Sequence, residues 1–285
     1  MADTQLVRVP VEYPFCLDTT LKSGQLFHWE AIEWYGLSGY AGCIGSNAPT
    51  FIASDGAGGV FISNGHAERA TRYFGLDQDM ETIHSTFPTN DLVLKDAIAF
   101  CPGIRLARQP LWECLATFIT SSLKQVAHIR GISMTLRQRY GTPYTLDGKS
   151  FYSYPEPESF VEAGEGELRK CALGYRAKSL FLAARAVSEG EIDLEKIENE
   201  MDLSEARVEL MKLHGVGDKI ANCALLFGSG RWGAFPIDVW IERILRDLYR
   251  KRVKGPKLQL WAERYFGENA GYAQQYLFHF ARKTL

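Results

Sequence analysis

The spacing of apolar residues changes near residue 65 of this chain. Before that point, apolar and aromatic residues form short runs at residues 21–30, 34–40, 51–53 and 60–63. The last two runs flank the glycine-rich turn at residues 55–59, and a turn that short joins antiparallel strands. From His66 onward the spacing becomes helical, with Gly or Pro between segments. We therefore predict an α+β protein in which an N-terminal antiparallel sheet is joined to a mostly α-helical body.

The helical part divides into several segments. Helices are expected at residues 67–74, at 111–140 with a break near 121–124, at 172–188 and within 271–285, with a loop at 152–159. A chain of 285 residues is long enough for two subdomains. We place the first at residues 1–105, with its sheet extending to about residue 65, and the helical subdomain at residues 106–285.

Residues 210–245 carry the most information about function. Two helical runs there flank Gly215-Val216-Gly217, a tight reversal whose backbone can approach another molecule closely. The first helix is expected to open at Asp202, with Glu205 as its capping-box partner. Asp218 is expected to cap the second helix. The buried stripe of this second helix would contain Ile220, Ala221, Ala224, Leu225 and Phe227.

This hairpin favours two kinds of chemistry. Free N–H groups at its tip and at the start of the second helix form an anion site suited to a phosphate. The same positive helix end disfavours a charged ammonium group in the first helical turn, where Lys219 lies. A neutral lysine is a nucleophile, so the sequence predicts a reactive amine beside a phosphate site.

A carboxylate follows one helix and one loop later. Pro236 keeps the chain extended, and Asp238 falls at the cap position of the next helix, where backbone groups would hold its carboxylate. A lysine after a glycine hairpin, followed at this spacing by Pro-x-Asp, resembles the helix–hairpin–helix DNA glycosylase superfamily, whose members remove damaged bases. The resemblance implies a helix–hairpin–helix motif in the helical body.

Charge is unevenly distributed, although the net charge is only −2. Between residues 105 and 139, Glu113 stands alone against the basic residues Arg105, Arg108, Lys124, Arg130, Arg137 and Arg139. A second basic run covers residues 250–254, whereas acidic residues collect at 189–209. This segregation predicts a positive face for a polyanion such as DNA. The alternative is that these charges only solvate helix faces.

The six cysteines include no Cys-x-x-Cys pair. Scattered thiols are typical of a reducing compartment and not of a disulfide framework. They also lack the four-cysteine spacing that iron–sulfur glycosylases carry after the hairpin region, so we expect no iron–sulfur cluster. No apolar run reaches membrane-spanning length, and residues 1–10 are unlike a signal peptide. We expect an intracellular protein without a membrane partner, in the nucleoid or cytoplasm of a prokaryote or the nucleus of a eukaryote.

Further motifs narrow the resemblance. Residues 21–29, Leu-Lys-Ser-Gly-Gln-Leu-Phe-His-Trp, are similar to the SGQ-F-W signature of the 8-oxoguanine DNA glycosylase/AP lyase family. The likeness continues in the same order through residues 114–122, 173–177, the hairpin, 236–238 and 273–278, and covers most of the chain. It implies a monomeric base-excision-repair enzyme that removes 8-oxoguanine from double-stranded DNA and also cleaves the strand.

The resemblance assigns catalytic roles to two residues. Lys219 would attack C1′ of the damaged nucleotide, displace the base and hold the sugar as a Schiff base that permits β-elimination. Asp238 would stabilise the oxocarbenium-like charge and orient the amine. The alternatives are a solvated lysine at a helix start and a plain helix cap.

The resemblance also implies a pocket for a base that has left the stack. N7 of 8-oxoguanine is a donor, unlike N7 of guanine, and the carbonyl of Gly24 would accept its hydrogen bond. Phe278 and Cys223 would sandwich the base, and Gln274 would bond to its Watson–Crick edge. Since Phe278 and Cys223 also lie on apolar helix stripes, the alternative is that both are core residues.

Other residues are expected to contact the rest of the duplex. By resemblance, Tyr175 would wedge beside the vacated site, and Arg176 would contact the orphaned partner base. His214, Gly215 and Gly217 would bind the DNA backbone at the hairpin. Backbone carbonyls of the hairpin are also a possible site for a monovalent cation.

The chain departs from the family's eukaryotic members where the partner base is read. Leu123-Lys124-Gln125 stands in place of an asparagine run, and His128 in place of an arginine. Leucine cannot bond to a base edge, and histidine is a weaker, pH-dependent donor. We therefore expect a relaxed preference for cytosine opposite the lesion. Trp240 replaces a histidine common after the Pro-x-Asp turn, which removes one expected phosphate contact.

Two other functions share part of this pattern. A monofunctional alkylbase glycosylase of the same superfamily uses the aspartate with water and needs no lysine, so Lys219 counts against it. A non-catalytic DNA-binding module uses the hairpin alone, and Asp238 and Gly24 would then be incidental. Covalent trapping on damaged DNA distinguishes the lyase from both alternatives.

Overall fold

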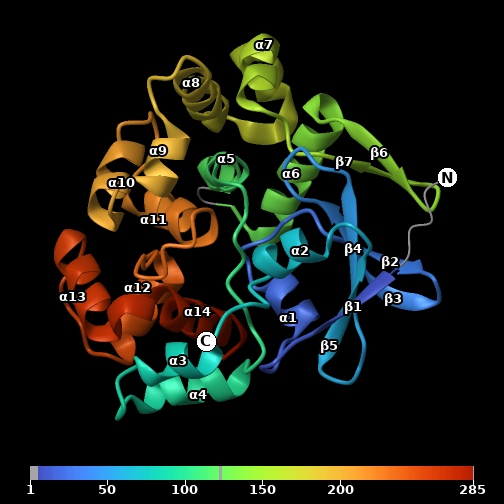
Figure 1. Ribbon diagram of the computed structural model, residues 1–285. Helices are drawn as coiled ribbons and strands as arrows, with labels where there is room; N and C mark the ends of the chain where they lie inside the picture. The colour runs from blue at the N-terminus through green and yellow to red at the C-terminus, as the bar shows by residue number, and fades with distance from the viewer. Residues whose placement is uncertain (1–5, 122–123, 285) are drawn as a thin grey trace.

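The computed structural model describes residues 6–121 and 124–284, and a five-stranded antiparallel sheet forms its N-terminal part (Figure 1). The strands are β1 (Leu6–Pro10), β2 (Glu30–Trp34), β3 (Leu37–Cys43), β4 (Pro49–Ser54) and β5 (Gly59–Ser63). Their order is β1-β5-β4-β3-β2, so β2 to β5 form a meander and β1 pairs with β5. The predicted turn at residues 55–59 joins β4 to β5, which confirms the antiparallel sheet.

Two predictions in this region are wrong in detail. Residues 21–30 do not form a strand, because the run begins in helix α1 (Leu17–Lys22) and continues as an irregular segment to residue 29. Residues 34–40 cross the tight turn between β2 and β3, where Tyr35 and Gly36 both have positive φ. Strand β1 was not predicted, because its pairing partner β5 lies far away in the sequence.

Both faces of the sheet are covered. On one face, Ile52 and Ile62 pack with Trp29 and with Phe74, which follows helix α2 (Ala67–Tyr73). On the other, Phe51 of β4 packs with residues of a second hairpin, β6 (Pro143–Leu146) and β7 (Lys149–Tyr152). Because β4 is buried on both sides, its sequence is continuously apolar at the centre instead of alternating.

Helices make up the rest of the chain (Figure 1). They are α3 (Met80–Ser85), α4 (Leu92–Phe100), α5 (Leu111–Ser121), α6 (Val126–Tyr140), α7 (Pro157–Leu168), a π-helical turn (Arg169–Leu173), α8 (Arg176–Ser188), α9 (Leu194–Asn199), α10 (Leu203–Leu210), α11 (Asp218–Phe227), α12 (Val239–Asp247), α13 (Pro256–Phe266), a 3₁₀ turn (Gly267–Asn269) and α14 (Ala270–Thr284). The α+β class is therefore confirmed. Helix α4 packs on α14, and the subdomain division at residue 105 stays a prediction. Within residues 6–121 and 124–284, no helix combines the length and the apolar character needed to cross a membrane.

Helix α5 lies at the centre of the molecule, and all of its residues are buried. Its Glu113 forms a buried ion pair with Arg137 of α6 and accepts a 3.0 Å hydrogen bond from the Gly45 backbone N–H. The ring Nδ1 of His28 lies 3.5 Å from the same carboxylate. This cluster joins the sheet to the helical body.

The basic surface predicted between residues 105 and 139 is smaller than expected. Arg105 and Arg137 are each only 1% exposed, so they belong to the interior. Arg105 donates a 3.3 Å hydrogen bond to the Tyr13 carbonyl, and Arg137 pairs with Glu113. The count of charges in the sequence could not separate these buried arginines from surface ones.

The helix–hairpin–helix motif is present, with one shift in register. Asp202 caps α10, and its reciprocal capping box with Glu205 is confirmed. The second helix, α11, is capped by the extended residue Gly217, and Asp218 is its first helical residue with no capping hydrogen bond from its side chain. Asp218 is therefore not the cap that we predicted, but Lys219 still lies in the first turn.

Candidate active site

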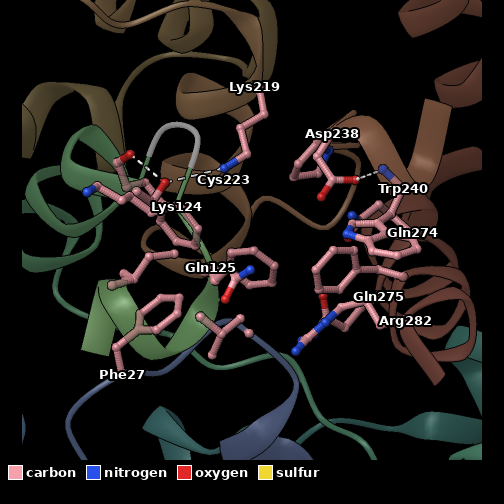
Figure 2. A pocket seen from close by; sticks show the side chains of 18 of the residues that line it. Phe27, Lys124, Gln125, Lys219, Cys223, Asp238, Trp240, Gln274, Gln275 and Arg282 are labelled. Atoms are coloured by element: carbon pink, nitrogen blue, oxygen red, sulfur yellow. Dashed lines mark hydrogen bonds between the residues drawn. The ribbon is translucent and has the colours of Figure 1, made fainter. Parts of the chain in front are cut away.

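A cavity of about 680 Å³ opens where α5, α6, α11, α12 and α14 meet. It is lined by Gly24, Phe27, Phe118, Ser121, Lys124, Gln125, Val126, Ala127, Ile129, Lys219, Cys223, Phe227, Pro236, Asp238, Trp240, Gln274, Gln275, Phe278 and Arg282. All six residues predicted for catalysis and base binding therefore face one space, although they come from four separate segments. Figure 2 shows Lys219 and Asp238 at the same end of this cavity, on opposite sides.

Lys219 is the second residue of α11 and is half-buried. Its Nζ lies 3.4 Å from the Ser121 hydroxyl and 5.1 Å from the centre of the Phe118 ring. Both partners belong to the last turn of α5, so the amine points across the cavity wall and not into bulk water. The alternative of a freely solvated lysine at a helix start does not fit this position.

Asp238 caps helix α12, as the sequence predicts. Its carboxylate accepts hydrogen bonds from the backbone N–H groups of Trp240 (3.0 Å) and Ile241 (2.9 Å). Burial raises the pKa of Asp238, while these two hydrogen bonds and the charges of Lys219 and Arg282 act in the opposite direction. The capping bonds fix the carboxylate at the cavity wall, so capping and a catalytic role use the same geometry.

The segment Ser23-Gly24-Gln25 is held by a buried network around Gln25. The Gln25 side chain donates to the Arg105 carbonyl (2.7 Å) and accepts from the Ala107 N–H (2.7 Å). Gly24 has a φ of +93°, a conformation that strongly favours glycine. A Cβ at this position would lie 3.1 Å from Cε1 of Phe278. The fixed position of Gly24 leaves its backbone open to the cavity.

The other predicted base-pocket residues lie around the same space. Cys223 is buried, and burial raises the pKa of its thiol to about 11. Phe278 is half-buried at the cavity wall, one helical turn after Gln274 on α14. The Gln274 Oε1 is buried and has no hydrogen-bond partner in the described chain. Cys223 and Phe278 pack with the core and also face the cavity. The alternative that both are core residues therefore accounts for only part of their surroundings.

Of the residues predicted to touch DNA outside the pocket, Tyr175 and His128 are exposed at the rim. Tyr175, the residue before α8, is 60% exposed, whereas Arg176 is 6% exposed and its guanidinium lies 4.4 Å from the Tyr175 ring. Arg176 is therefore largely buried, and its contact with the partner base stays a prediction. His128 is exposed in the first turn of α6. Leu123 lies outside the described residues.

The hairpin residues have distinct roles in the turn. Gly215 has a φ of +80°, and a Cβ there would lie 2.4 Å from the Ser179 hydroxyl. His214 is exposed and its ring Nδ1 lies 3.0 Å from the same hydroxyl. A Cβ on Gly217 would meet open space, so another molecule can approach the backbone closely at this position. The DNA contacts of these residues stay predictions.

Sequence reasoning missed several residues of the cavity. Lys124 and Gln125 line it at the α5–α6 junction, and Arg282 lines it from the last turn of α14. The signal for Arg282 was available, because Gln274, Phe278 and Arg282 are each four residues apart and share one helix face. The sequence motif places Lys124 and Gln125 near the partner base, but residues at a helix break have no fixed direction that would point them into this cavity.

All six cysteines are free. In the described part of the chain, no group of three or more His, Cys, Asp or Glu side chains is placed to hold a metal. The expected absence of an iron–sulfur cluster and the monovalent cation at the hairpin stay predictions.

Comparison with known proteins agrees with this geometry. A model of the 8-oxoguanine DNA glycosylase N-terminal domain matches residues 7–115. A probable N-glycosylase/DNA lyase from Methanothermobacter thermautotrophicus is 31% identical, covering 76% of this chain and 75% of the relative. The N-glycosylase/DNA lyase OGG1 of Arabidopsis thaliana is 28% identical, covering 92% and 76%.

Solved structures match over nearly the whole length. The structure of MBOgg1 in complex with a low-affinity DNA ligand is 36% identical, with a TM-score of 0.89 and 99% of each chain covered. The Clostridium acetobutylicum 8-oxoguanine glycosylase/lyase, bound to DNA with cytosine opposite 8-oxoguanine, is 28% identical with a TM-score of 0.88 and the same coverage. The chain thus belongs to the 8-oxoguanine DNA glycosylase/lyase family of the helix–hairpin–helix superfamily.

Proposed function

We propose that this protein is a bifunctional DNA glycosylase and AP lyase that removes 8-oxoguanine from double-stranded DNA. The observation that carries this proposal is the composition of one cavity. Its sugar end contains an amine and a carboxylate, Lys219 and Asp238, and its base end contains Gly24, Phe278 and Cys223. A DNA-binding module needs no such cavity, and a monofunctional glycosylase needs no amine in it.

The chemistry begins with the amine of Lys219 in its neutral form. Its lone pair attacks C1′ of the flipped nucleotide, the C1′–N9 bond breaks, and the electron pair leaves with the base. Positive charge develops on the sugar during this step, and the carboxylate of Asp238 stabilises it across the cavity. Loss of a proton from the attached nitrogen and opening of the sugar ring then give a Schiff base, which permits β-elimination of the 3′ phosphate.

Recognition depends on the difference between a donor and an acceptor at N7. The backbone of Gly24 reaches the cavity without a side chain, and the carbonyl would accept a hydrogen bond from N7–H of 8-oxoguanine. Guanine presents a lone pair at N7, so the same carbonyl would repel it. The unpartnered Oε1 of Gln274 is available to accept from the N–H groups of the Watson–Crick edge. Selectivity thus comes from polar groups that an undamaged base leaves unsatisfied.

The duplex is expected to lie across the hairpin and the exposed rim. The space beside Gly217, the N-cap of α11, is open, and the backbone N–H groups of a helix start suit a phosphate. The exposed ring of Tyr175 suits a wedge that replaces lost stacking. Flipping the base costs a few kcal/mol, which the pocket and the wedge together must offset. We expect the protein to act as a monomer on this DNA.

Borohydride trapping tests the proposal. Native protein incubated with 8-oxoguanine duplex should form a covalent adduct, and Lys219→Gln should form none while binding the same duplex with an affinity within about threefold of native. Lys212→Gln is a matched control, because Lys212 is exposed between α10 and the hairpin and forms an ion pair with Glu209 of α10. It should trap normally. Excision without any adduct would instead indicate a monofunctional enzyme, and binding alone would indicate a DNA-binding module.

A further inference from the structure

Arg282 brings a positive charge into the base end of the cavity. It lies in the last turn of α14, on the same face as Gln274 and Phe278. Its Nη1 atom is 3.2 Å from the position that a Cβ would take on Gly24, and its Cζ is 5.3 Å from the centre of the Phe278 ring. Figure 2 shows the side chain reaching toward the cavity beside Gln275. The guanidinium therefore lies where the flipped base would meet Gly24.

This guanidinium has spare donors. Among residues 6–121 and 124–284, no acceptor forms a hydrogen bond or ion pair with Arg282, although its five N–H donors are fixed in one plane. Burial lowers the pKa of Arg282, and the charge of Asp238 raises it. An arginine nevertheless stays charged inside proteins. A half-buried cation without a protein acceptor, facing a cavity, suits a ligand with negative charge.

The proposed reaction produces such a charge in this place. When the C1′–N9 bond breaks, the purine takes the electron pair, and the charge spreads over N9 and the neighbouring O8 carbonyl. We propose that Arg282 is a catalytic residue that donates N–H hydrogen bonds to the departing 8-oxoguanine and stabilises its developing negative charge. This inference rests on the proposed function. Arg282 keeps its proton, and the base anion takes up one proton from solvent, which balances the proton that Lys219 releases on bonding to C1′.

A positioning role through Asp238 is the competing explanation. Arg282 lowers the pKa of Asp238, so its removal would raise that pKa and leave less carboxylate at a given pH. The charge of Lys219 also lowers the pKa of Asp238, as do the capping hydrogen bonds that Asp238 accepts from the N–H groups of Ile241 and Trp240. A loss caused by protonation of Asp238 would disappear at high pH, whereas a lost hydrogen bond to the leaving base would persist. The two explanations therefore predict different pH profiles.

The experiment compares two reactions of the same variant. Under single-turnover conditions, Arg282→Met should excise 8-oxoguanine roughly 10- to 100-fold more slowly, which is the usual effect of losing a hydrogen bond to a charged group. The variant should cleave a pre-formed abasic site at a rate within about threefold of native, because no base departs there. Lys283→Met removes an exposed cation from the same helical turn and should excise normally. Arg282→Lys should recover part of the lost rate.

Each outcome has a defined meaning. An excision defect that persists from neutral to alkaline pH, with abasic-site cleavage retained, supports the proposal. A defect that vanishes as pH rises, an equal loss in both reactions, or normal excision by Arg282→Met overturns it. If native protein traps at abasic sites but releases no 8-oxoguanine, the proposed function fails, and this failure is visible without any Arg282 variant.

Discussion

The substitution Gly24→Ala tests how the base end of the cavity is built. Gly24 has a φ of +93°, where an alanine is strained by about 1–2 kcal/mol. The added Cβ would also lie 3.1 Å from Cε1 of Phe278 and 3.2 Å from Nη1 of Arg282. Both contacts are too close, so the ring and the guanidinium must each move by a few tenths of an ångström. The substitution therefore acts on stability and on the pocket separately.

The two effects have different sizes and different readouts. Backbone strain should lower the melting temperature by a few degrees, since about 1 kcal/mol corresponds to roughly 2–4 °C in a protein of this size. Displacement of Phe278 should slow 8-oxoguanine excision by roughly tenfold or more, because small errors in the position of a reacting group are costly. Cleavage of a pre-formed abasic site uses Lys219 and no base, so it should stay near the native rate.

A substitution at a second glycine separates the effect of backbone strain from the effect of crowding in the pocket. Gly36, in the β2–β3 turn, has a φ of +73°, and a Cβ there would meet no atom within 4 Å. Gly36→Ala should lower the melting temperature by a similar amount and leave excision unchanged. If Gly24→Ala excises 8-oxoguanine within twofold of Gly36→Ala, the carbonyl and ring positions inferred for the base pocket are wrong.

Four further predictions concern other parts of the protein. The Asp238→Asn side chain can still cap α12, but the substitution removes a buried carboxylate whose pKa is raised by burial. The variant should therefore be more stable than native protein at neutral pH. Its excision rate should fall at least tenfold. Native excision should likewise fall on acidification at a pH above the usual range of an aspartate, and an acid limb at or below that range would contradict this. Glu113→Gln leaves the buried Arg137 unpaired and should cost about 3–5 kcal/mol in urea unfolding, with a smaller loss when Arg137→Met is added. Finally, excision rates with each of the four bases opposite 8-oxoguanine should differ by less than about tenfold, and strong selectivity for cytosine would refute the relaxed preference.

Local sequence patterns predicted the parts of the site that depend on local geometry. The capping position of Asp238 follows from Pro236 and from the helical spacing after it, and the structure has this cap. Lys219 lies in the first turn of α11 even though the cap is Gly217 and not Asp218, because a shift of one residue leaves the first turn in place. These predictions succeed because each concerns residues within a few positions of one another.

Patterns of charge and of apolar runs failed where distant partners decide the structure. Arg137 is an ordinary basic residue in the sequence, and its burial depends on Glu113, which lies on another helix. The run at residues 21–30 resembles a strand, but Gln25 bonds to the backbone of Arg105 and Ala107 and holds this run as an irregular segment. A sequence contains these partners without indicating that they meet.

The two ends of the cavity are set by different parts of the fold, so lesion recognition and strand chemistry can change independently. Lys219 and Asp238 each lie at a helix N-terminus, on α11 and α12, and both positions are fixed by hairpin or loop backbone. Gln274, Phe278 and Arg282 lie along one face of α14, opposite the backbone of Gly24. A substitution on the α14 face alters which base fits and how well it departs, while the amine keeps its position for the sugar. Cleavage of abasic DNA should therefore tolerate variation in α14 that excision does not.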